Sequence, residues 1–359
     1  MKAVEFYSGI GGLHLALSRS NVSASITHAF DWDQNACDVY SANFGPGIAR
    51  KMDISTLTAS YLESLEAALW LLSPACQPYT VLNPLAKGEL DPRAASLLHL
   101  VQHILPQLAQ SNSHPTHLLV ENVGGFETST TRQILVSTLQ SLGYAIAEFL
   151  LTPLQFGIPN SRLRYYLLAK RMPLAFRHEP GGTLRHIPGF SAWIDPRASN
   201  GAPDDNVREI RGYLDSELVE DYTIPDKILS KWGRLFDIIL PSSRRTCCFT
   251  RGYTQLVERS GSILQMNEDE DTGAVFDTFL ASSAADSVRI LDTLRLRYFS
   301  PDELLRLFNF TPEKSFIWPN GMSRKTKYRL IGNSVNVKVV QELIVYLFQE
   351  PYTETMQVE

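Results

Sequence analysis

The stretch that decides the fold is Phe6-Tyr-Ser-Gly-Ile-Gly-Gly12, which follows the apolar run Ala3–Tyr7 and precedes the helical pattern Leu13–Arg19. A glycine-rich turn between a strand and a helix lets backbone amides and the helix N-terminus come close to a ligand. Such a turn is also typical of a tight bend that binds nothing. The pyrophosphate pattern is incomplete, because His14 stands where a third glycine is expected. This favours an adenosyl group without pyrophosphate.

The next apolar run, Ile26–Asp31, ends about 20 residues further on, with an acid followed by the aromatic residue Trp32. An acid at this place commonly binds ribose hydroxyls, and an aromatic ring can stack on adenine. The turn and this strand end together predict a nucleoside-bearing cofactor.

Short apolar runs alternate with helical patterns through the first 170 residues. This alternation predicts an α/β fold, a Rossmann-like parallel sheet with helices on both faces. The further strands that we expect are Leu69–Ser73, His117–Glu121, Tyr144–Leu151 and Arg164–Lys170, and the further helices are Ser55–Ala67, Ala94–Leu108 and Thr131–Leu142.

The alternation is lost from residue 172, where Pro, Gly and Asn punctuate the chain, as in Asn200-Gly-Ala-Pro203. A helical period returns in Pro301–Phe308 and Val335–Gln349. We therefore predict one domain from residues 1–171 and 299–359, which the last helix rejoins, and a smaller domain from residues 172–298.

Composition excludes several classes of protein. The chain has 359 residues, 44% of them hydrophobic and 20% charged, which excludes a disordered polyelectrolyte and a disulfide-dense scaffold. The sequence has no apolar stretch of about 18 residues and no apolar leader, so we expect no membrane association and a location in the cytoplasm, with the nucleus as a second compartment. The four cysteines lack zinc-site spacing, so we expect no metal site.

Charge is unevenly distributed, although the net charge is -5. Residues 204–226 hold eight acidic and two basic residues, whereas residues 227–259 hold seven basic and two acidic ones, and residues 289–329 nine basic and four acidic ones. Two interpretations stay open: ordinary solvated faces, or a cationic groove for a phosphate backbone.

Three more candidates lie at or near strand ends. Cys76 follows an apolar strand within Ser73-Pro-Ala-Cys-Gln-Pro78, where open α/β sheets place their chemistry, although most single cysteines are buried small residues. Glu121 ends another apolar strand, and burying an acid there needs a partner or a function. Arg162 and Arg164 precede or begin the last strand, where they could also be surface charges.

The order of these motifs, followed by Gly332-Asn-Ser-Val335, resembles the motif series of the cytosine-5 methyltransferases of DNA-methyltransferase type. Within them, Thr246-Cys-Cys-Phe-Thr-Arg-Gly-Tyr253 with Gly261-Ser-Ile-Leu-Gln265 is similar to the DNA methyltransferase 2 branch, which methylates tRNA. The resemblance covers essentially the whole chain. It implies a SAM-dependent methyltransferase sheet with a smaller target-recognition domain.

The resemblance also implies the roles of the four catalytic candidates. Cys76 adds as a thiolate to C6 of cytosine, which makes C5 nucleophilic. Glu121 holds the N3 and amino edge of the base. Arg162 and Arg164 orient that acid and the base carbonyl. We expect their charge to raise the thiolate fraction of Cys76.

The implied cofactor is S-adenosylmethionine. By the same resemblance, the methionine and ribose side of the cofactor is lined by Tyr7, Ser8, Gly9 and Gly11. The ribose and adenine are lined by Asp31, Trp32 and Asp53. The pocket is closed by Asn333, Ser334 and Val335.

The implied substrate is tRNA, with cytosine 38 in the anticodon loop of aspartate tRNA as the target and DNA as a weak second substrate. Two residues depart from the pattern. Ala75 replaces the second proline before Cys76, and Gly124 stands where the branch usually has lysine. Two alternatives therefore stay open: a DNA cytosine-5 methyltransferase, and a catalytically idle RNA-binding homologue. Protein partners and oligomeric state are not readable from the sequence.

Overall fold

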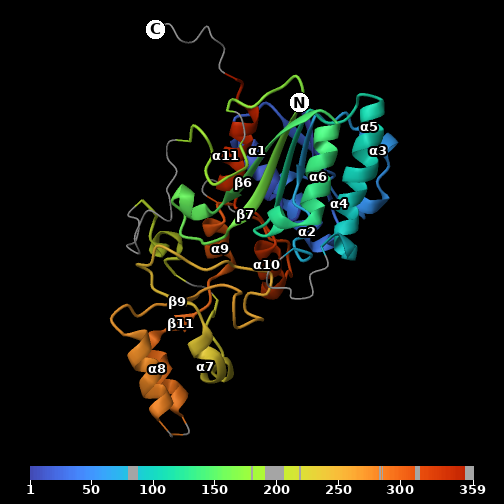
Figure 1. Ribbon diagram of the computed structural model, residues 1–359. Coiled ribbons are helices and arrows are strands. Elements are labelled where there is room, and N and C mark those ends of the chain that lie inside the picture. Colours follow the sequence, from blue (N-terminus) through green and yellow to red (C-terminus); the bar gives the residue numbers. More distant parts are fainter. Residues whose placement is uncertain are drawn as a thin grey trace.

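The structure is a computed structural model that describes residues 1–79, 88–178, 181–190, 206–217, 220–282, 284, 286–311 and 316–351. Its centre is an eight-stranded sheet with helices on both faces (Figure 1), which confirms the predicted α/β fold. In spatial order the strands are β3 (Ala49–Lys51), β2 (Ser25–Asp31), β1 (Lys2–Phe6), β4 (Leu69–Leu72), β5 (His117–Val123), β7 (Arg164–Arg171), β6 (Tyr144–Leu151) and β8 (Thr183–Leu184).

The sheet is mixed, so the expectation of a parallel sheet is wrong for one strand. β7 runs antiparallel to both β5 and β6, whereas β1, β2, β3, β4 and β5 pair in parallel. The connection from β6 to β7 holds one short 3₁₀ turn, Pro153–Phe156, and no helix that could carry a parallel crossover. β7 therefore starts beside the carboxyl end of β5, with Arg164 opposite Val123.

Each face of the large sheet is covered by its own set of helices, and each set buries one apolar cluster (Figure 1). One face carries α1 (Gly12–Arg19), α2 (Gln34–Phe44) and α11 (Val337–Phe348), and α11 packs directly on α1. The other carries α3 (Ala59–Ser64), α4 (Ala95–His99), α5 (Leu105–Gln110) and α6 (Thr130–Ser141), with the π-helical turn Leu100–Ile104 joining α4 to α5. No helix among the described residues has the length and apolarity to cross a membrane.

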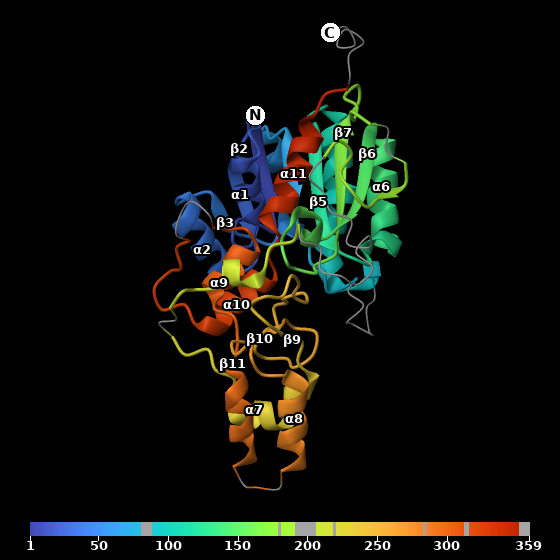
Figure 2. The same ribbon diagram turned by 90° about the vertical axis from the view of Figure 1, so that its left-hand side faces the viewer.

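A second, smaller sheet lies below the first and is formed by β9 (Ile238–Ile239), β10 (Ile263–Gln265) and β11 (Leu296–Arg297). Beyond it a lobe containing α7 (Asp226–Trp232) and α8 (Thr272–Ala281) projects from the molecule (Figure 2). The chain then returns through α9 (Pro301–Leu307) and α10 (Arg324–Gly332).

The division into residues 172–298 and the rest stays a prediction. β8 belongs to the edge of the large sheet, and the apolar cluster under α1 and α11 continues to Phe249 and Leu264. The predicted turn Asn200-Gly-Ala-Pro203 lies outside the described residues.

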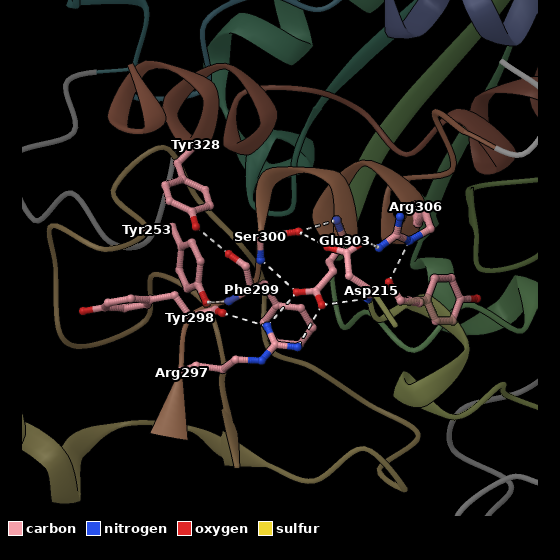
Figure 3. Close-up of polar contacts among 10 residues, drawn as sticks. Asp215, Tyr253, Arg297, Tyr298, Phe299, Ser300, Glu303, Arg306 and Tyr328 are labelled. Carbon is pink, nitrogen blue, oxygen red and sulfur yellow. Dashed lines mark hydrogen bonds and ion pairs between the residues drawn. The ribbon is translucent and has the colours of Figure 1, made fainter. Parts of the chain in front are cut away.

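A buried ion pair joins the small sheet to α9 (Figure 3). Both terminal nitrogens of Arg297 donate to the carboxylate of Glu303 at 2.8 Å, and Glu303 is fully buried. Glu303 also closes a capping box with Ser300 and accepts the backbone N–H of Asp215. A buried ion pair is stable only when such extra hydrogen bonds satisfy it.

The same junction holds the loop around Tyr253. Its hydroxyl donates to the Ser262 carbonyl. The same hydroxyl accepts the backbone N–H of Phe299, while the hydroxyl of Tyr328 donates to the Phe299 carbonyl (Figure 3). The small sheet, α9 and α10 are thereby fixed to one another.

Candidate active site

A cavity of about 230 Å³ opens at the carboxyl ends of β1, β2, β4 and β5. Open α/β sheets bind their ligands at this edge. Eight of the predicted site residues line it: Tyr7, Gly9, Asp31, Cys76, Glu121, Arg162, Arg164 and Asn333. The fold therefore brings the predicted chemistry and part of the predicted cofactor site into one place.

The glycine-rich turn is shaped by left-handed backbone conformations. Tyr7, Gly9 and Gly11 have φ values of 58°, 52° and 85°. The N–H of Gly9 donates to Asp31 Oδ2 at 2.7 Å, and the N–H of Asp33 donates to Oδ1 at 2.8 Å. Burial raises the pKa of Asp31 against the effect of these bonds. The acid thus ties the turn after β1 to the end of β2.

Cys76 lies in the loop after β4, which neighbouring strands hold in place. The Ser73 hydroxyl donates to the Tyr7 carbonyl at 3.0 Å, and the Asn122 amide donates to the Pro74 carbonyl at 3.4 Å. Burial raises the pKa of the Cys76 thiol, and the opposing charge of Arg164 is smaller. The expected rise in its thiolate fraction is therefore wrong, because burial outweighs the arginine charge.

Glu121 is buried near the end of β5, where its carboxylate oxygen Oε1 lies 3.3 Å from Arg164 Nε. Burial raises the pKa of Glu121 despite the nearby arginines. A raised pKa favours the protonated form of the carboxyl group, which is the form that can donate to a heterocycle.

Arg162 binds backbone rather than Glu121. Its guanidinium donates to the carbonyls of Phe249 at 2.8 Å, Gly332 at 3.2 Å and Ser334 at 2.6 Å. It also contacts the sulfur of Cys248 at 3.4 Å. This buried side chain therefore joins the segment before β7 to two segments that are distant in the sequence.

Six predicted cofactor residues do not line the cavity. Ser334 and Val335 pack against Gly12, where an added Cβ would lie 2.7 Å from Val335 Cγ2. At Gly11 an added Cβ would lie 2.2 Å from the Phe44 ring, so the absence of a side chain there lets α1 and α2 approach. These residues shape the turn and do not line the pocket.

Of the other three, Ser8 is buried in the turn, and its hydroxyl has no hydrogen-bond partner among the described residues. The Trp32 ring is 70% exposed beside the end of β2. Asp53 is exposed and caps the 3₁₀ turn Ile54–Thr56. An exposed aromatic ring and an unpartnered buried hydroxyl can both accept a ligand, but their roles stay predictions.

Sequence reasoning did not single out two other residues of this site. An added Cβ at Gly332 would lie 2.2 Å from the Thr250 carbonyl carbon, so only glycine allows this close approach. Cys248 contacts both arginines. Its place in the Cys-Phe-Thr block indicated that Cys248 belongs to a family motif, but no neighbouring residue in the sequence distinguished its surroundings from those of Cys247.

Nearly the whole chain is similar to one family of known proteins. The sequence model for "C-5 cytosine-specific DNA methylase" matches residues 1–349. The chain belongs to this family. A relative named tRNA (cytosine(38)-C(5))-methyltransferase, from Schizosaccharomyces pombe, is 39% identical over 97% of this chain and 97% of its own length. A relative named DNA (cytosine-5)-methyltransferase, from Dictyostelium discoideum, is 34% identical over 97% of this chain and 94% of its own.

Among solved structures, a mutant of Spodoptera frugiperda DNMT2 is similar, with a TM-score of 0.82 and 34% identity over 97% of this chain and 99% of that one. This C-5 cytosine methylase is therefore of the Dnmt2 type, as the block around Cys248-Phe-Thr predicted, and it is a methyltransferase with the family's Rossmann-like fold.

Proposed function

We propose that this chain is a tRNA cytosine-5 methyltransferase that uses S-adenosylmethionine and acts on cytosine 38 in the anticodon loop, with aspartate tRNA as its main substrate. The names of its relatives support tRNA and this position. A base in an anticodon loop is already partly unstacked, so bringing it into the cavity costs less free energy than extruding it from a duplex.

The residues on the β1 and β2 side of the cavity fit S-adenosylmethionine. An added Cβ at Gly9 would have no atom within 4 Å, so open space lies beside this glycine for a ligand. Asp31 would bind the ribose, Trp32 would stack on adenine, and the Ser8 hydroxyl would gain a partner. When bound, the cofactor supplies an electrophilic methyl group on a positively charged sulfur.

The residues on the other side fit the chemistry of cytosine. The Cys76 thiolate would form a bond to C6, which makes C5 nucleophilic, and C5 would then take the methyl group. Glu121 would hold N3 and the amino group as charge develops on the ring. Arg164 would keep Glu121 in place. Loss of the C5 proton and cleavage of the sulfur–C6 bond would release the methylated base.

The observation that carries this proposal is that Cys76, Glu121 and Arg164 meet in one cavity with Gly9 and Asp31. The test is transfer of a radiolabelled methyl group to tRNA by the wild type and by Cys76→Ala. We expect transfer by the wild type and a loss of at least about a thousandfold in the variant. Transfer by Cys76→Ala at the wild-type rate would contradict the covalent step.

The second candidate is DNA cytosine-5 methylation, favoured by the name of the Dictyostelium discoideum relative. A parallel assay with duplex DNA separates the two, because label in DNA and none in tRNA would reverse the substrate assignment. An idle RNA-binding protein would bind tRNA but form no covalent adduct with RNA that contains 5-fluorocytosine.

A further inference from the structure

Two adjacent cysteines lie in opposite electrostatic surroundings. Cys247 lies beside Ser262 and Asp237, and burial together with the Asp237 carboxylate raises its pKa to about 11. The sulfur of Cys248 lies 3.4 Å from Arg162 Nη1 and 3.7 Å from Arg164 Nη2. Burial alone would raise the pKa of Cys248, but the two guanidinium groups outweigh it and lower the pKa.

The two positive charges of Arg162 and Arg164 are only partly balanced by the nearby carboxyl group. Arg162 and Arg164 bring two positive charges into a largely buried site, whereas Glu121, when ionised, brings one negative charge, which pairs with Arg164 and also acts on Arg162. Among the described residues Arg162 forms no ion pair with a carboxylate. A thiolate at Cys248 would make the number of positive and negative charges equal.

The hydrogen bonds lead to the same inference. Among the described residues, the one acceptor that a neutral Cys248 thiol reaches is the Phe249 carbonyl, at a long 3.7 Å, and this carbonyl also accepts the shorter 2.8 Å bond from Arg162 Nη1. Both arginines instead direct N–H donors at the sulfur. A thiolate accepts such bonds much better than a neutral thiol does.

We propose that Cys248 is a positioning residue for methyl transfer, because its sulfur is the counter-ion that fixes the guanidinium groups of Arg162 and Arg164. This inference rests on the proposed function. Arg164 lies between the Cys248 sulfur and the Glu121 carboxylate, so fixing it from one side fixes the acid on the other. Cys248 itself would not touch the substrate.

The ionisable groups that face this sulfur come from several segments. Arg162 and Arg164 are in contact with it, Glu121 and Cys76 lie beyond Arg164, and Tyr166 follows on β7. From the segment after α10 it is backbone carbonyls, not charged groups, that reach Arg162.

The first experiment measures the ionisation of the Cys248 thiol in the full-length C247S variant. In this variant the neighbouring cysteine is replaced, so labelling of the peptide reports on Cys248 alone. The protein is pulse-labelled with iodoacetamide between pH 5.5 and 10, and the peptides that contain Cys248 and Cys76 are quantified by mass spectrometry. The midpoint of the pH dependence reports ionisation independently of access. We expect the midpoint of Cys248 below about 8.5, the ordinary thiol value, and that of Cys76 above it. A Cys248 midpoint at or above that of Cys76 would overturn the proposal.

The second experiment separates charge from packing by comparing kcat for C248S and C248D on tRNA. Serine matches the shape of cysteine but is neutral, whereas aspartate supplies an anion. We expect a loss of about tenfold in C248S, since misplaced catalytic groups cost about this much or more, a loss under about threefold in C248D, and no change in the matched control C247S.

In the wild type, Cys248 is protonated below its midpoint, so C248S and the wild type should converge in kcat at low pH. A C248S variant as active as, or more active than, C248D would show a packing role and overturn the proposal. If the wild type transfers no methyl group to tRNA, the proposed function fails, while the labelling midpoint still decides whether Cys248 is the counter-ion.

Discussion

The two walls of the cavity are built in different ways. The strand wall presents three side chains: Cys76 from the loop after β4, Glu121 from near the end of β5, and Arg164 from the start of β7. The closing wall, formed by Gly332 and Asn333 at the cavity with Ser334 and residues 248–251 beside them, has no strand, and it holds Arg162 mainly through backbone carbonyls. The strand wall therefore depends on which side chains it carries, and the closing wall depends on where its backbone lies.

The largest expected effect tests what supports the closing wall. In Glu303→Gln the buried Arg297 loses its anion, and we expect the free energy of unfolding to fall by about 3 kcal/mol or more. Urea unfolding followed by circular dichroism measures this. The control is Asp277→Asn, which removes an exposed pair with Arg234 worth at most about 1 kcal/mol. Equal losses of unfolding free energy in the two variants would show that the Arg297–Glu303 ion pair does not support the closing wall.

The next effect tests the backbone of the closing wall directly. Gly332→Ala places a Cβ where the Thr250 backbone lies, and overpacking of this kind costs about 1–3 kcal/mol. Because Arg162 binds the carbonyls of Gly332 and of Phe249, which precedes Thr250, kcat should fall more than unfolding of the protein alone explains. Gly212→Ala is the control, since its Cβ would meet no atom within 4 Å. A normal kcat in Gly332→Ala would show that activity does not depend on where the backbone of the closing wall lies.

A third prediction concerns the strand wall and pH. The proposed reaction needs the Cys76 thiolate, and burial holds the pKa of this thiol above its usual value. Below that pKa, each decrease of one pH unit should lower kcat/KM about tenfold, because the thiolate fraction falls tenfold. The rate is measured from pH 6 to 9.5 together with binding of the cofactor, which should change little. A flat profile would mean that the free enzyme already holds a thiolate.

The smallest expected effect concerns Trp32 beside the cavity. Stacking of an aromatic ring contributes about 0.5–1.5 kcal/mol, so Trp32→Ala should raise the KM for S-adenosylmethionine roughly two- to tenfold. Stability should not change, because the ring is exposed. Trp232→Ala on α7 is the matched control and should leave KM unchanged. An unchanged KM in both variants would remove Trp32 from the cofactor site.

Most of the strand wall could be predicted from the sequence, because apolar runs mark the strands locally. The strand before Cys76 and the strand that holds Glu121 differ from their predicted bounds by two residues or fewer, and Tyr144–Leu151 in the same sheet was predicted at its observed bounds. The antiparallel direction of β7 was not predicted, since direction depends on the length and content of a connection. The helices α2 and α10 were also missed, because their polar composition hides the helical period.

The closing wall could be predicted only as motifs. Resemblance to a family named the Cys-Phe-Thr block and Gly332-Asn-Ser-Val335, yet it did not show that both meet at Arg162. No local pattern distinguishes the surroundings of Cys248 from those of Cys247. The difference arises from Arg162 and Arg164 on one side and Asp237 on the other, each distant from the cysteines in sequence.

The packing of Ser334 and Val335 on Gly12 has a consequence for how the protein is made. A ribosome synthesises the glycine-rich turn first and the residues that close it more than 300 positions later. Arg162 likewise waits for the carbonyls of residues 332 and 334. Since such long-range contacts form late, a nascent chain can fold much of its sheet while its cavity stays open. Catalytic competence should therefore appear only after residues 332–335 have left the ribosome.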